Sequence, residues 1–556
     1  MFFSKSVKRG HIRMLEKVKK IPKSAILYLV LAIFMILAVS MKVNYYIDEI
    51  YTYGLSNYNG NGIDMEIEYD KTYTPGTSVY DDYMKVQNGQ RFDYVNVWRN
   101  QTNDVHPPLY YALIHTICSV FPNKFSKWFA AGINIIFVLL TLYMVRKIIS
   151  LFTDNKFILW SISLSFVTLS GIIMTATYFR MYCMATFWVT LLTCLFLKQV
   201  DEKQTRKFYL LIGLTTIAGA LTHYYVIVYA FFLSVVYGVY LLKKKRYAET
   251  AWFCLTMGCA GCISIAVFPA MIKHIFFGYR GTEAIDNFKK SDNYWDNLKA
   301  FFQIVNSQLF GNILAYILIA LLVLACVGML QKYTDVLAES KMTKLSLPLD
   351  HKVKIRYILI FVPCVCYFMI VSKITFVNAD RYMWPIYAIA FTAVMCLTCT
   401  IWRQVLKDGA FIVVTAMMIA VIAWGSFSSC GWQYLFRESQ NLLAEAYAHN
   451  QYDCICVLEG DSYWLYPEFA EYSNYKSITF VTADEIDQGQ ISQWTDHNNG
   501  IVISYINYPG DRDENLNQLK EMYGYTGYEY LGTYGMDNTY FLHLSLIHIS
   551  EPTRRS

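Results

Sequence analysis

Charged residues are scarce in this sequence, although it is 556 residues long. Asp, Glu, Lys and Arg make up only 16% of the chain, whereas a soluble globular protein carries about 25%. Hydrophobic residues reach 55%, and many of them gather in runs long enough to cross a hydrocarbon core of about 30 Å. This composition excludes a soluble enzyme, a disordered chain and a fibrous repeat. It predicts an α-helical polytopic membrane protein.

Several binding motifs are also missing. The polar C-terminal part contains no GxGxxG or Walker-type loop, so nucleotide binding is not indicated. The basic residues are scattered among short loops and do not form a face with interleaved aromatics, so we expect no nucleic-acid partner. Most of the 14 cysteines lie inside apolar runs, and we interpret them as small core hydrophobes.

Hydropathy predicts eleven membrane spans. They lie near residues 24–41, 128–145, 157–178, 181–197, 208–222, 226–242, 251–272, 309–330, 357–371, 383–401 and 410–427. A secretory signal has a shorter apolar core followed by a small-residue cleavage site. The first run has neither feature, so we expect it to be retained as a span.

The distribution of Lys and Arg predicts the orientation of these spans. With the N-terminus in the cytoplasm, the inner segments collect 27 Lys and Arg, and the outer loops before residue 428 collect 15. Cytoplasmic loops are the ones enriched in positive charge. Eleven spans then place the C-terminal segment on the non-cytoplasmic side of the membrane.

The chain divides into four parts under this topology. Residues 1–23 form a basic cytoplasmic N-terminus, and 24–429 form a transmembrane module whose first outer loop, 42–127, is large and polar. Residues 430–544 carry 17 acidic against 4 basic side chains. The last residues, 545–556, resemble a non-native tail and are excluded from the functional argument.

The segment 430–544 predicts a small extracytoplasmic α/β domain. Short apolar runs at 454–458, 477–481 and 500–504 are bounded by turn residues, as strands are. A helical stretch at 513–523 and a last strand at 539–544 follow. Alternation of this kind favours a layered domain with a largely parallel sheet.

Ionisable residues collect at the outer face of the predicted membrane module, although they are far apart in the sequence. They are Asp48 and Glu49 after the first span, Asp104 and His106 in the stretch Asp-Val-His-Pro-Pro-Leu-Tyr-Tyr111, Arg180 and Tyr182 in one tight turn, His223 and Tyr224 in another, and Asp380 and Arg381 before the tenth span. Polar groups at this depth are costly and therefore informative. Each one alone could be a solvated cap or an interfacial anchor, but together they indicate a site.

The chemistry that such a set can perform is transfer from a lipid-borne phosphate. A carboxylate can accept the proton of an acceptor hydroxyl as a general base. Arginine suits a phosphate because its planar guanidinium matches two phosphate oxygens. A departing phosphate needs only stabilisation of its charge.

These residues resemble the polytopic GT-C glycosyltransferases. The resemblance rests on the acidic pair Asp48-Glu49, the Asp-x-His-Pro-Pro-Leu motif from Asp104, the turn at Arg180 and the outer His223, and it covers roughly residues 20–430. Within that class the chain is most similar to the bacterial Rgt-like group, which is related to protein O-mannosyltransferases and aminoarabinose lipid A transferases.

The resemblance implies roles for individual residues. Asp48 would be the catalytic base and Glu49 would support it. The sugar and phosphate of the donor would be bound by the remaining residues, namely Asp104, His106, Arg180, Tyr182, His223, Tyr224 and Arg381. It also implies a polyprenyl-phosphate sugar as donor, an inverting transfer, and a glycan, lipid or protein acceptor outside the membrane.

No cofactor is certain from the sequence. Asp48, Glu49, Asp104 and His106 could supply oxygen and nitrogen ligands to a divalent metal ion, while a close Asp-Glu pair is equally expected of a metal-free base.

Two other kinds of protein stay open at this point. A transporter or flippase for a lipid-linked or small anionic substrate would place ionisable residues or broken helices near the middle of its spans, whereas the spans predicted here are mostly unbroken. A structural or sensory membrane protein would leave the clustering of charges at one face unexplained.

Overall fold

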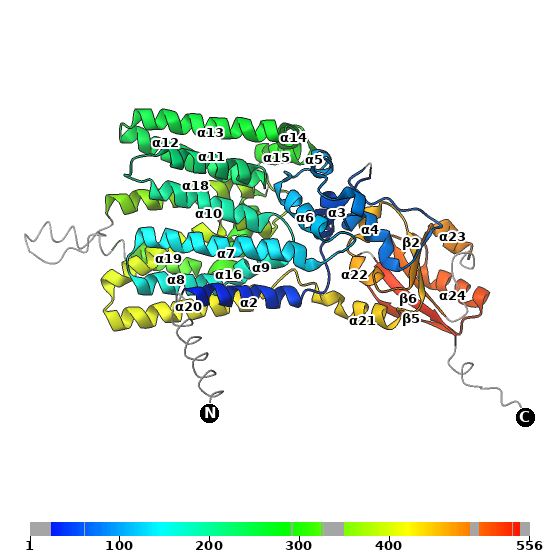
Figure 1. Cartoon of the computed structure of the whole chain (residues 1–556). Coiled ribbons are helices and arrows are strands. Elements are labelled where there is room, and N and C mark those ends of the chain that lie inside the picture. The colour runs from blue at the N-terminus through cyan, green and yellow to red at the C-terminus, as the bar shows by residue number, and fades with distance from the viewer. Residues whose placement is uncertain are drawn as a thin grey trace, which may run out of the picture.

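The computed structural model describes residues 24–60, 62–290, 293–323, 326, 350–489, 500–535 and 537–544. Long helices lie side by side, and a mixed α/β domain lies beyond one end of them together with residues of the segment 42–127 (Figure 1). We call this end of the helices the domain end. The predicted basic segment 1–23 and the tail 545–556 lie outside the described residues.

Helices make up most of the described part of the membrane module. They are α2 (Ala25–Ser40), α7 (Lys127–Phe152), α8 (Lys156–Thr168), α9 (Ser170–Thr177), α10 (Tyr182–Lys198), α11 (Arg206–Ala220), α12 (Tyr224–Lys243), α13 (Tyr247–Val267), α14 (Ala270–Phe276), α15 (Tyr279–Lys289), α16 (Tyr294–Phe310), Leu314–Val323, α18 (His351–Ile374), α19 (Trp384–Val405) and α20 (Asp408–Cys430). The short η3 (Asp380–Tyr382) precedes α19.

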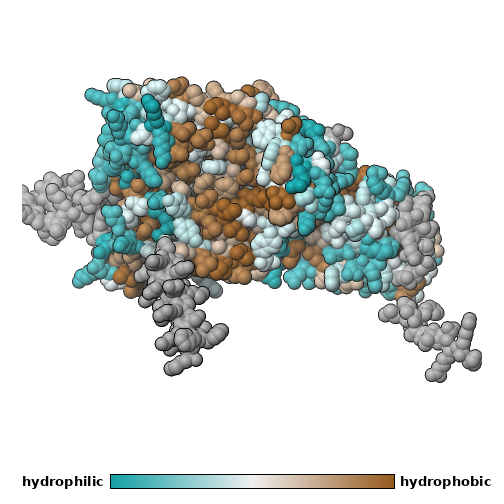
Figure 2. All heavy atoms as spheres, viewed as in Figure 1, coloured by the Kyte–Doolittle hydropathy of each residue, from teal (hydrophilic) through white to brown (hydrophobic). Residues whose placement is uncertain are grey.

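The chain is a multi-pass membrane protein. Six described helices are long and apolar enough to cross a membrane, and the number reaches eight if each bent helix pair counts as one span. Figure 2 shows a hydrophobic belt across the helices with hydrophilic borders on both sides. Each predicted span coincides with a described helix or helix pair, apart from the end of 309–330, which lies outside the described residues. The total of eleven spans stays a prediction.

Two helix pairs are bent, and one of the bends breaks the predicted span 157–178. α8 and α9 meet at 48° around Leu169, and α16 meets the helix Leu314–Val323 at 88°. Gly311 stands at the second break with a φ of +56°, a conformation that favours glycine because it has no Cβ. The predicted span 157–178 is therefore an exception to the expectation of mostly unbroken spans, whereas the bend at Gly311 lies at the start of the predicted span 309–330.

One backbone group at each bend bonds to the same serine of α20. Ser426 Oγ of α20 accepts the backbone N–H of Ser170 at 3.1 Å and donates to the carbonyl of Gln308 at 2.8 Å. In a membrane, freed backbone groups are tolerated when neighbouring helices satisfy them in this way. α20 thus ties the two bends to each other.

The α/β domain contains one six-stranded mixed sheet in the order β1-β3-β2-β4-β6-β5. Its strands are β1 (Thr72–Tyr73), β2 (Asp453–Leu458), β3 (Ser477–Val481), β4 (Ile501–Ile506), β5 (Gly527–Gly532) and β6 (Asp537–His543). Its helical elements are η4 (Arg437–Ser439), α21 (Gln440–Ala448), η5 (Ser462–Leu465), α22 (Phe469–Tyr472), α23 (Ala483–Asp487) and α24 (Arg512–Tyr523).

The predicted α/β layering is confirmed, with one correction to the sheet. β3, β2 and β4 are parallel, whereas β6 pairs antiparallel with β4, and β5 pairs antiparallel with β6. All residues of β2, β3 and β4 are buried, which explains why the sequence shows them as continuous apolar runs. β5 alternates less clearly and carries exposed residues, so hydropathy missed it.

The segment after α2 is part of the same unit as this domain. It contains α3 (Ile47–Asn57), η1 (Gly76–Tyr80), α4 (Asp81–Met84), η2 (Asn88–Gln90), α5 (Tyr94–Asn103) and α6 (Leu109–Val120). Its strand β1 pairs antiparallel with β3, and Tyr80 Oη donates to the carbonyl of Leu465 at 2.9 Å. The predicted limits 42–127 and 430–544 therefore describe sequence segments that share one sheet.

The backbones of α20 and of the bend at Gly311 lie in close contact. A Cβ added to Gly425 of α20 would lie 2.4 Å from the carbonyl oxygen of Gly311, so one of the two backbones would have to move. We expect Gly425→Ala to lower the melting temperature of the detergent-solubilised protein by several degrees, because overpacking typically costs about 1–3 kcal/mol.

The matched control is Gly409→Ala in the same helix, since a Cβ at Gly409 would meet no atom within 4 Å. Melting curves of the two variants and of the wild-type protein, followed by size-exclusion chromatography after heating, measure the effect. Equal melting temperatures for the two variants would contradict the close packing at the bend.

Candidate active site at the domain end of the helices

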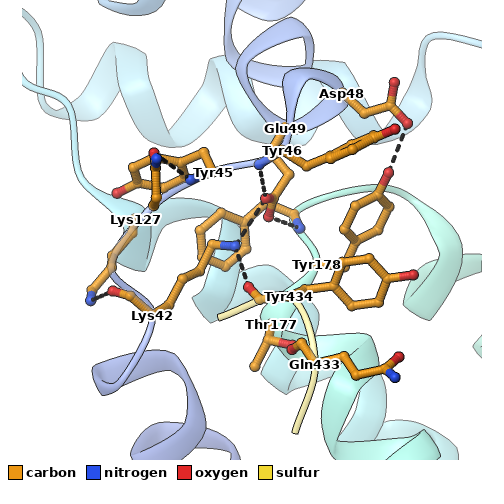
Figure 3. Close-up of polar contacts among 12 residues, drawn as sticks. Lys42, Tyr45, Tyr46, Asp48, Glu49, Lys127, Thr177, Tyr178, Gln433 and Tyr434 are labelled. Carbon is orange, nitrogen blue, oxygen red and sulfur yellow. Dashed lines mark hydrogen bonds and ion pairs between the residues drawn. The ribbon is translucent and has the colours of Figure 1, made fainter. Parts of the chain in front are cut away.

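The carboxylate of Glu49 accepts three hydrogen bonds. It is fully buried in the first turn of α3. Its Oε2 accepts from Lys42 Nζ at 2.9 Å and from the Tyr46 N–H at 2.7 Å, and its Oε1 accepts from the Phe179 N–H at 2.8 Å (Figure 3). Lys42 is also buried and donates to the carbonyl of Tyr434 at 2.7 Å. Glu49 therefore joins three chain segments.

Asp48 precedes Glu49 in the same turn and points the other way (Figure 3). Its Oδ2 accepts from Tyr178 Oη at 2.7 Å and lies 3.5 Å from Arg381 Nη2. The side chain of Asp48 is 29% exposed, so a substrate can reach it. The fold thus fixes the direction of this carboxylate while leaving part of it open.

Arg180 lies in the turn between α9 and α10 and contacts several candidates at once. Its Nη1 donates to the carbonyl of Asp48 at 3.1 Å and to Tyr111 Oη at 3.0 Å. Its Nη2 lies 3.3 Å from His106 Nε2. Its Nε is buried and has no hydrogen-bond partner among the described residues. The turn that the sequence marks as tight therefore brings a cation directly behind the α3 carboxylate.

His106 and Asp104 form the next step of this chain of contacts. His106 Nδ1 lies 2.9 Å from Asp104 Oδ2. When Nδ1 carries the proton and donates to Asp104, Nε2 is free to accept from Arg180. The motif Asp-x-His thus orients the guanidinium of Arg180 from the start of α6.

Arg381 approaches Asp48 from η3. Its guanidinium carbon lies about 5.5 Å from the ring centres of Tyr178 and Tyr382, within the range of cation–π contacts. The preceding Asp380 is buried and accepts from Gln308 Nε2 at 2.9 Å, from the Arg381 N–H at 2.7 Å and from Tyr434 Oη. Asp380 therefore holds the η3 turn in place.

His223 and Tyr182 line the same group of side chains, but Tyr224 does not join it. The rings of His223 and Tyr182 lie 5.0 Å apart, and those of His223 and His106 lie 6.1 Å apart. His223 Nδ1 accepts the Tyr225 N–H and caps α12. Tyr224 instead bonds His274 Nδ1 at 2.8 Å, away from the contacts of Asp48.

Charge states follow from this packing. Burial alone would raise the pKa of Asp48, but Arg180, Arg381 and the Tyr178 hydroxyl hold it below its ordinary value. Burial and the neighbouring Arg180 lower the pKa of His106 despite the contact with Asp104. We therefore expect Asp48 to be ionised and His106 to be neutral near pH 7.

The four residues named as metal ligands do not fit that role in the described structure. Both oxygens of Glu49 are occupied by Lys42 and by two backbone amides. His106 turns one nitrogen to Asp104 and the other to an arginine. Asp48, Glu49, Asp104 and His106 do not converge as a group of three or more, and we derive no chemical step through a metal at this place.

Several members of the site were missed by sequence reasoning. Tyr178 bonds Asp48, Tyr434 bonds Asp380, and Lys42 pairs with Glu49. With 46 tyrosines in the chain, no local pattern separates Tyr178 or Tyr434 from tyrosines of a membrane interface. Lys42 could have been found, because a lysine directly after an apolar span needs a partner if it is buried.

An apolar cavity of about 320 Å³ opens among α11, α12, α13 and α14. Its lining includes Val226, three residues after His223, together with Ala230, Met257 and Met271. Val226 and Ala230 lie on α12, whose N-cap residue is His223.

We expect the buried pair Lys42–Glu49 to support the stability of this region. Glu49→Gln would leave the Lys42 charge buried without a counter-charge, and removing one partner of a buried pair typically costs about 3–5 kcal/mol. The free energy of unfolding in detergent should fall accordingly.

The control is Glu68→Gln, which breaks the exposed pair Lys71–Glu68 and should change the free energy of unfolding by less than about 1 kcal/mol. Similar losses in the two variants would contradict a special role of the buried pair.

Comparison with known proteins gives a match in structure alone. No protein-family model matches the chain, and no curated protein sequence matches it. The crystal structure of ArnT from Cupriavidus metallidurans bound to undecaprenyl phosphate is similar, with a TM-score of 0.50, 9% identity, and coverage of 94% of this chain and 98% of that one. Archaeal AglB from Archaeoglobus fulgidus, in complex with an inhibitory peptide and a dolichol-phosphate, gives a TM-score of 0.39 at 12% identity, covering 95% of this chain and 75% of that one.

The match to ArnT spans nearly all of both chains. At 9% sequence identity, this structural similarity indicates a shared fold and does not by itself indicate a shared activity. The expectation from the sequence resemblance is confirmed at that level: the chain has the GT-C fold, with a small C-terminal α/β domain.

Proposed function

We propose that this protein is a membrane glycosyltransferase that moves a sugar from a polyprenyl-phosphate donor to an acceptor outside a bacterial cell membrane. The acceptor would be a cell-wall polymer, a lipid or a protein. The N-terminus would be cytoplasmic and the α/β domain extracytoplasmic, with lipid around the helices. The fold shared with ArnT, which is bound to undecaprenyl phosphate in its crystal structure, supports the substrate class.

One observation carries the proposal, namely the position of Asp48 between two arginines. Arg381 Nη2 lies 3.5 Å from its carboxylate, and Arg180 donates to its backbone carbonyl. The three residues come from α3, from the turn before α10 and from η3, so only the complete fold assembles them. A partly exposed base next to two cations is what transfer from an anionic donor requires.

Asp48 would act as the general base. Its Oδ atom would accept the proton of the acceptor hydroxyl while that oxygen bonds to the anomeric carbon of the sugar. The bond between this carbon and the phosphate oxygen would break, and the electron pair would leave with the phosphate. An attack opposite to the leaving group inverts the anomeric centre.

Arg180 and Arg381 would stabilise the departing phosphate. The hydrogen-bonded chain from Asp104 through His106 would keep Arg180 oriented before the reaction, so that little reorganisation is needed when charge develops. His223 and Tyr182 would border the same space. Tyr224 would act through His274, as part of the wall behind it.

Glu49 would be a positioning residue, since its oxygens are engaged by Lys42 and by backbone amides. It would hold the first turn of α3 so that Asp48 points into the site. The apolar cavity beside His223 would take the beginning of the polyprenyl chain, because its lining is almost entirely hydrocarbon.

The alternative of a transporter or flippase gains one feature from the structure, which is the presence of two bent helices. Transporters use such breaks to present backbone groups to a substrate near the middle of the membrane. Here Ser426 bonds to Ser170 and Gln308 at the breaks, so these groups serve packing. We therefore prefer glycosyl transfer.

Asp48→Asn should abolish transfer, because an amide cannot accept the proton. The side chain keeps its shape, so expression and melting temperature should stay close to those of the wild-type protein. Transfer is measured with purified protein, a panel of polyprenyl-phosphate sugars and glycans extracted from the membrane, and glycans missing from a deletion strain identify the acceptor. Asp461→Asn, at an exposed carboxylate of the α/β domain, is the control, and normal turnover in Asp48→Asn would refute the proposed base.

The pH dependence gives a second test of the base. Because the pKa of Asp48 lies below its ordinary value, the carboxylate is already ionised at pH 5. We expect kcat/KM to be independent of the Asp48 titration between pH 5 and 8 and to fall only as the pH drops further toward that pKa. A limb that rises between pH 6 and 8 would indicate a different base.

Arg180→Ala should reduce kcat by about two to three decades and weaken use of the donor more than use of the acceptor, since a lost oxyanion donor has this effect. Arg180→Lys should restore little, because one ammonium group cannot reproduce the contacts to Asp48, Tyr111 and His106. The exposed Arg437 provides the control Arg437→Ala. Equal effects on the two substrates would argue against a phosphate role.

A further inference from the structure

Three buried carboxylates lie together in the α/β domain, away from the contacts of Asp48. Glu468 and Glu471 belong to the α22 region, and Asp537 begins β6. Their side chains are 0–1% exposed, and one ligand atom from each lies within 4.8 Å of the others. Figure 1 shows α22 lying close to the sheet. No other group of three or more His, Cys, Asp or Glu residues meets this criterion among the residues that the structure describes.

Only part of this cluster is satisfied by the protein. Glu471 Oε1 accepts from Tyr475 Oη at 2.8 Å and from Thr539 Oγ1 at 2.9 Å. Asp537 Oδ2 lies 2.9 Å from Thr539 Oγ1, and its Oδ1 accepts from Ser504 Oγ. Both oxygens of Glu468 and the Oε2 of Glu471 are buried and have no partner among the described residues.

The electrostatic balance of the cluster is incomplete. None of the ion pairs among the described residues involves Glu468, Glu471 or Asp537. A buried carboxylate without a partner is strongly unfavourable. Either protons or a bound cation must compensate for the three acidic groups.

Gly535 packs closely against the carboxylate of Glu468. Gly535 has a φ of +58°, and a Cβ at this position would lie 2.8 Å from Glu468 Oε1. A side chain at position 535 would therefore press against the carboxylate. Glycine fits both the backbone conformation and the room that the carboxylate needs.

We propose that Glu468, Glu471 and Asp537 form a binding site for one divalent cation, with Ca²⁺ as the best fit. All the unpartnered ligand atoms are carboxylate oxygens, which hard cations prefer, whereas thiolate or imidazole ligands would favour zinc. Ca²⁺ accepts a two-oxygen carboxylate such as that of Glu468 and tolerates irregular geometry. Both oxygens of Glu468 and one oxygen of Glu471 have no partner among the described residues, so they are available to a cation held between the three side chains.

The cation would connect the α/β domain to the active site. Phe469 directly follows Glu468, and its ring lies 4.9 Å from that of Tyr80, 5.0 Å from that of Phe125 and 5.7 Å from that of Tyr45. Tyr45 precedes Asp48 by three residues in the connection between α2 and α3. Fixing the start of α22 to β6 would hold the aromatic contacts that support this connection.

The test uses the purified full-length protein in detergent. After treatment with EDTA, CaCl₂ alone is added, and bound calcium is measured by elemental analysis together with the melting temperature. We expect one tightly held ion per chain and a melting temperature that rises with Ca²⁺. Glu468→Gln should reduce the affinity for Ca²⁺ at least tenfold, whereas Glu438→Gln, at an exposed glutamate of the same domain, should leave it unchanged.

In the opposite result the protein would bind none of the ions Ca²⁺, Mg²⁺, Mn²⁺ and Zn²⁺. Its melting temperature would then be the same with and without EDTA. A cluster held by shared protons predicts this outcome, and it would overturn the proposal. The wild-type titration decides the matter even if Glu468→Gln fails to fold, and Asp537→Asn provides a second variant. Because the readout is ion binding and melting, its failure would leave the proposed glycosyl transfer untouched.

Discussion

The buried contact between Glu49 and Lys42 organises the site on which the rest depends. It brings together the end of α2, the first turn of α3, the backbone before Arg180 and the backbone at Tyr434. A charged pair in such surroundings is stable only when hydrogen bonds satisfy its remaining donors and acceptors. Here three donors satisfy the carboxylate of Glu49. The turn is therefore held without the side chain of Asp48, which stays partly exposed. In the proposed function, adjacent residues therefore divide the roles: Glu49 holds the turn and Asp48 acts as the base.

The helices of the membrane module can be predicted from the sequence because each one requires a long apolar run. An apolar run of sufficient length has few alternatives to a helix in a membrane, and each predicted span coincides with a helix in the described residues. The two bends were not predicted, since they depend on contacts such as that between Gly311 and Gly425. Those residues are more than a hundred positions apart, and hydropathy does not register their approach. The antiparallel strands β5 and β6 show the same limit, because pairing is not a local property.

The sequence singled out charged residues that the structure brings into contact, but it did not single out all of their neutral neighbours. Asp48, Arg180, His106 and Arg381 are costly at a membrane border, so their presence was informative, and the structure places them in contact. Tyr178 has an equally direct contact with Asp48, yet tyrosine is abundant at such borders. The sequence also singled out Tyr224 together with its neighbour His223. The ring of His223 lies beside those of His106 and Tyr182, whereas Tyr224 bonds to His274.

The pairing of β1 with β3 has a consequence for how the chain matures. Residues 72–73 close one edge of a sheet whose other strands lie about 400 positions later, and an open sheet edge invites pairing with foreign chains. During synthesis the early segment must wait for nearly the entire bundle to be inserted before its partner strand exists. A shortened chain that ends after the last helix would leave this segment without its docking surface. The sheet outside the membrane is therefore completed late in synthesis, when the C-terminal segment pairs with residues 72–73.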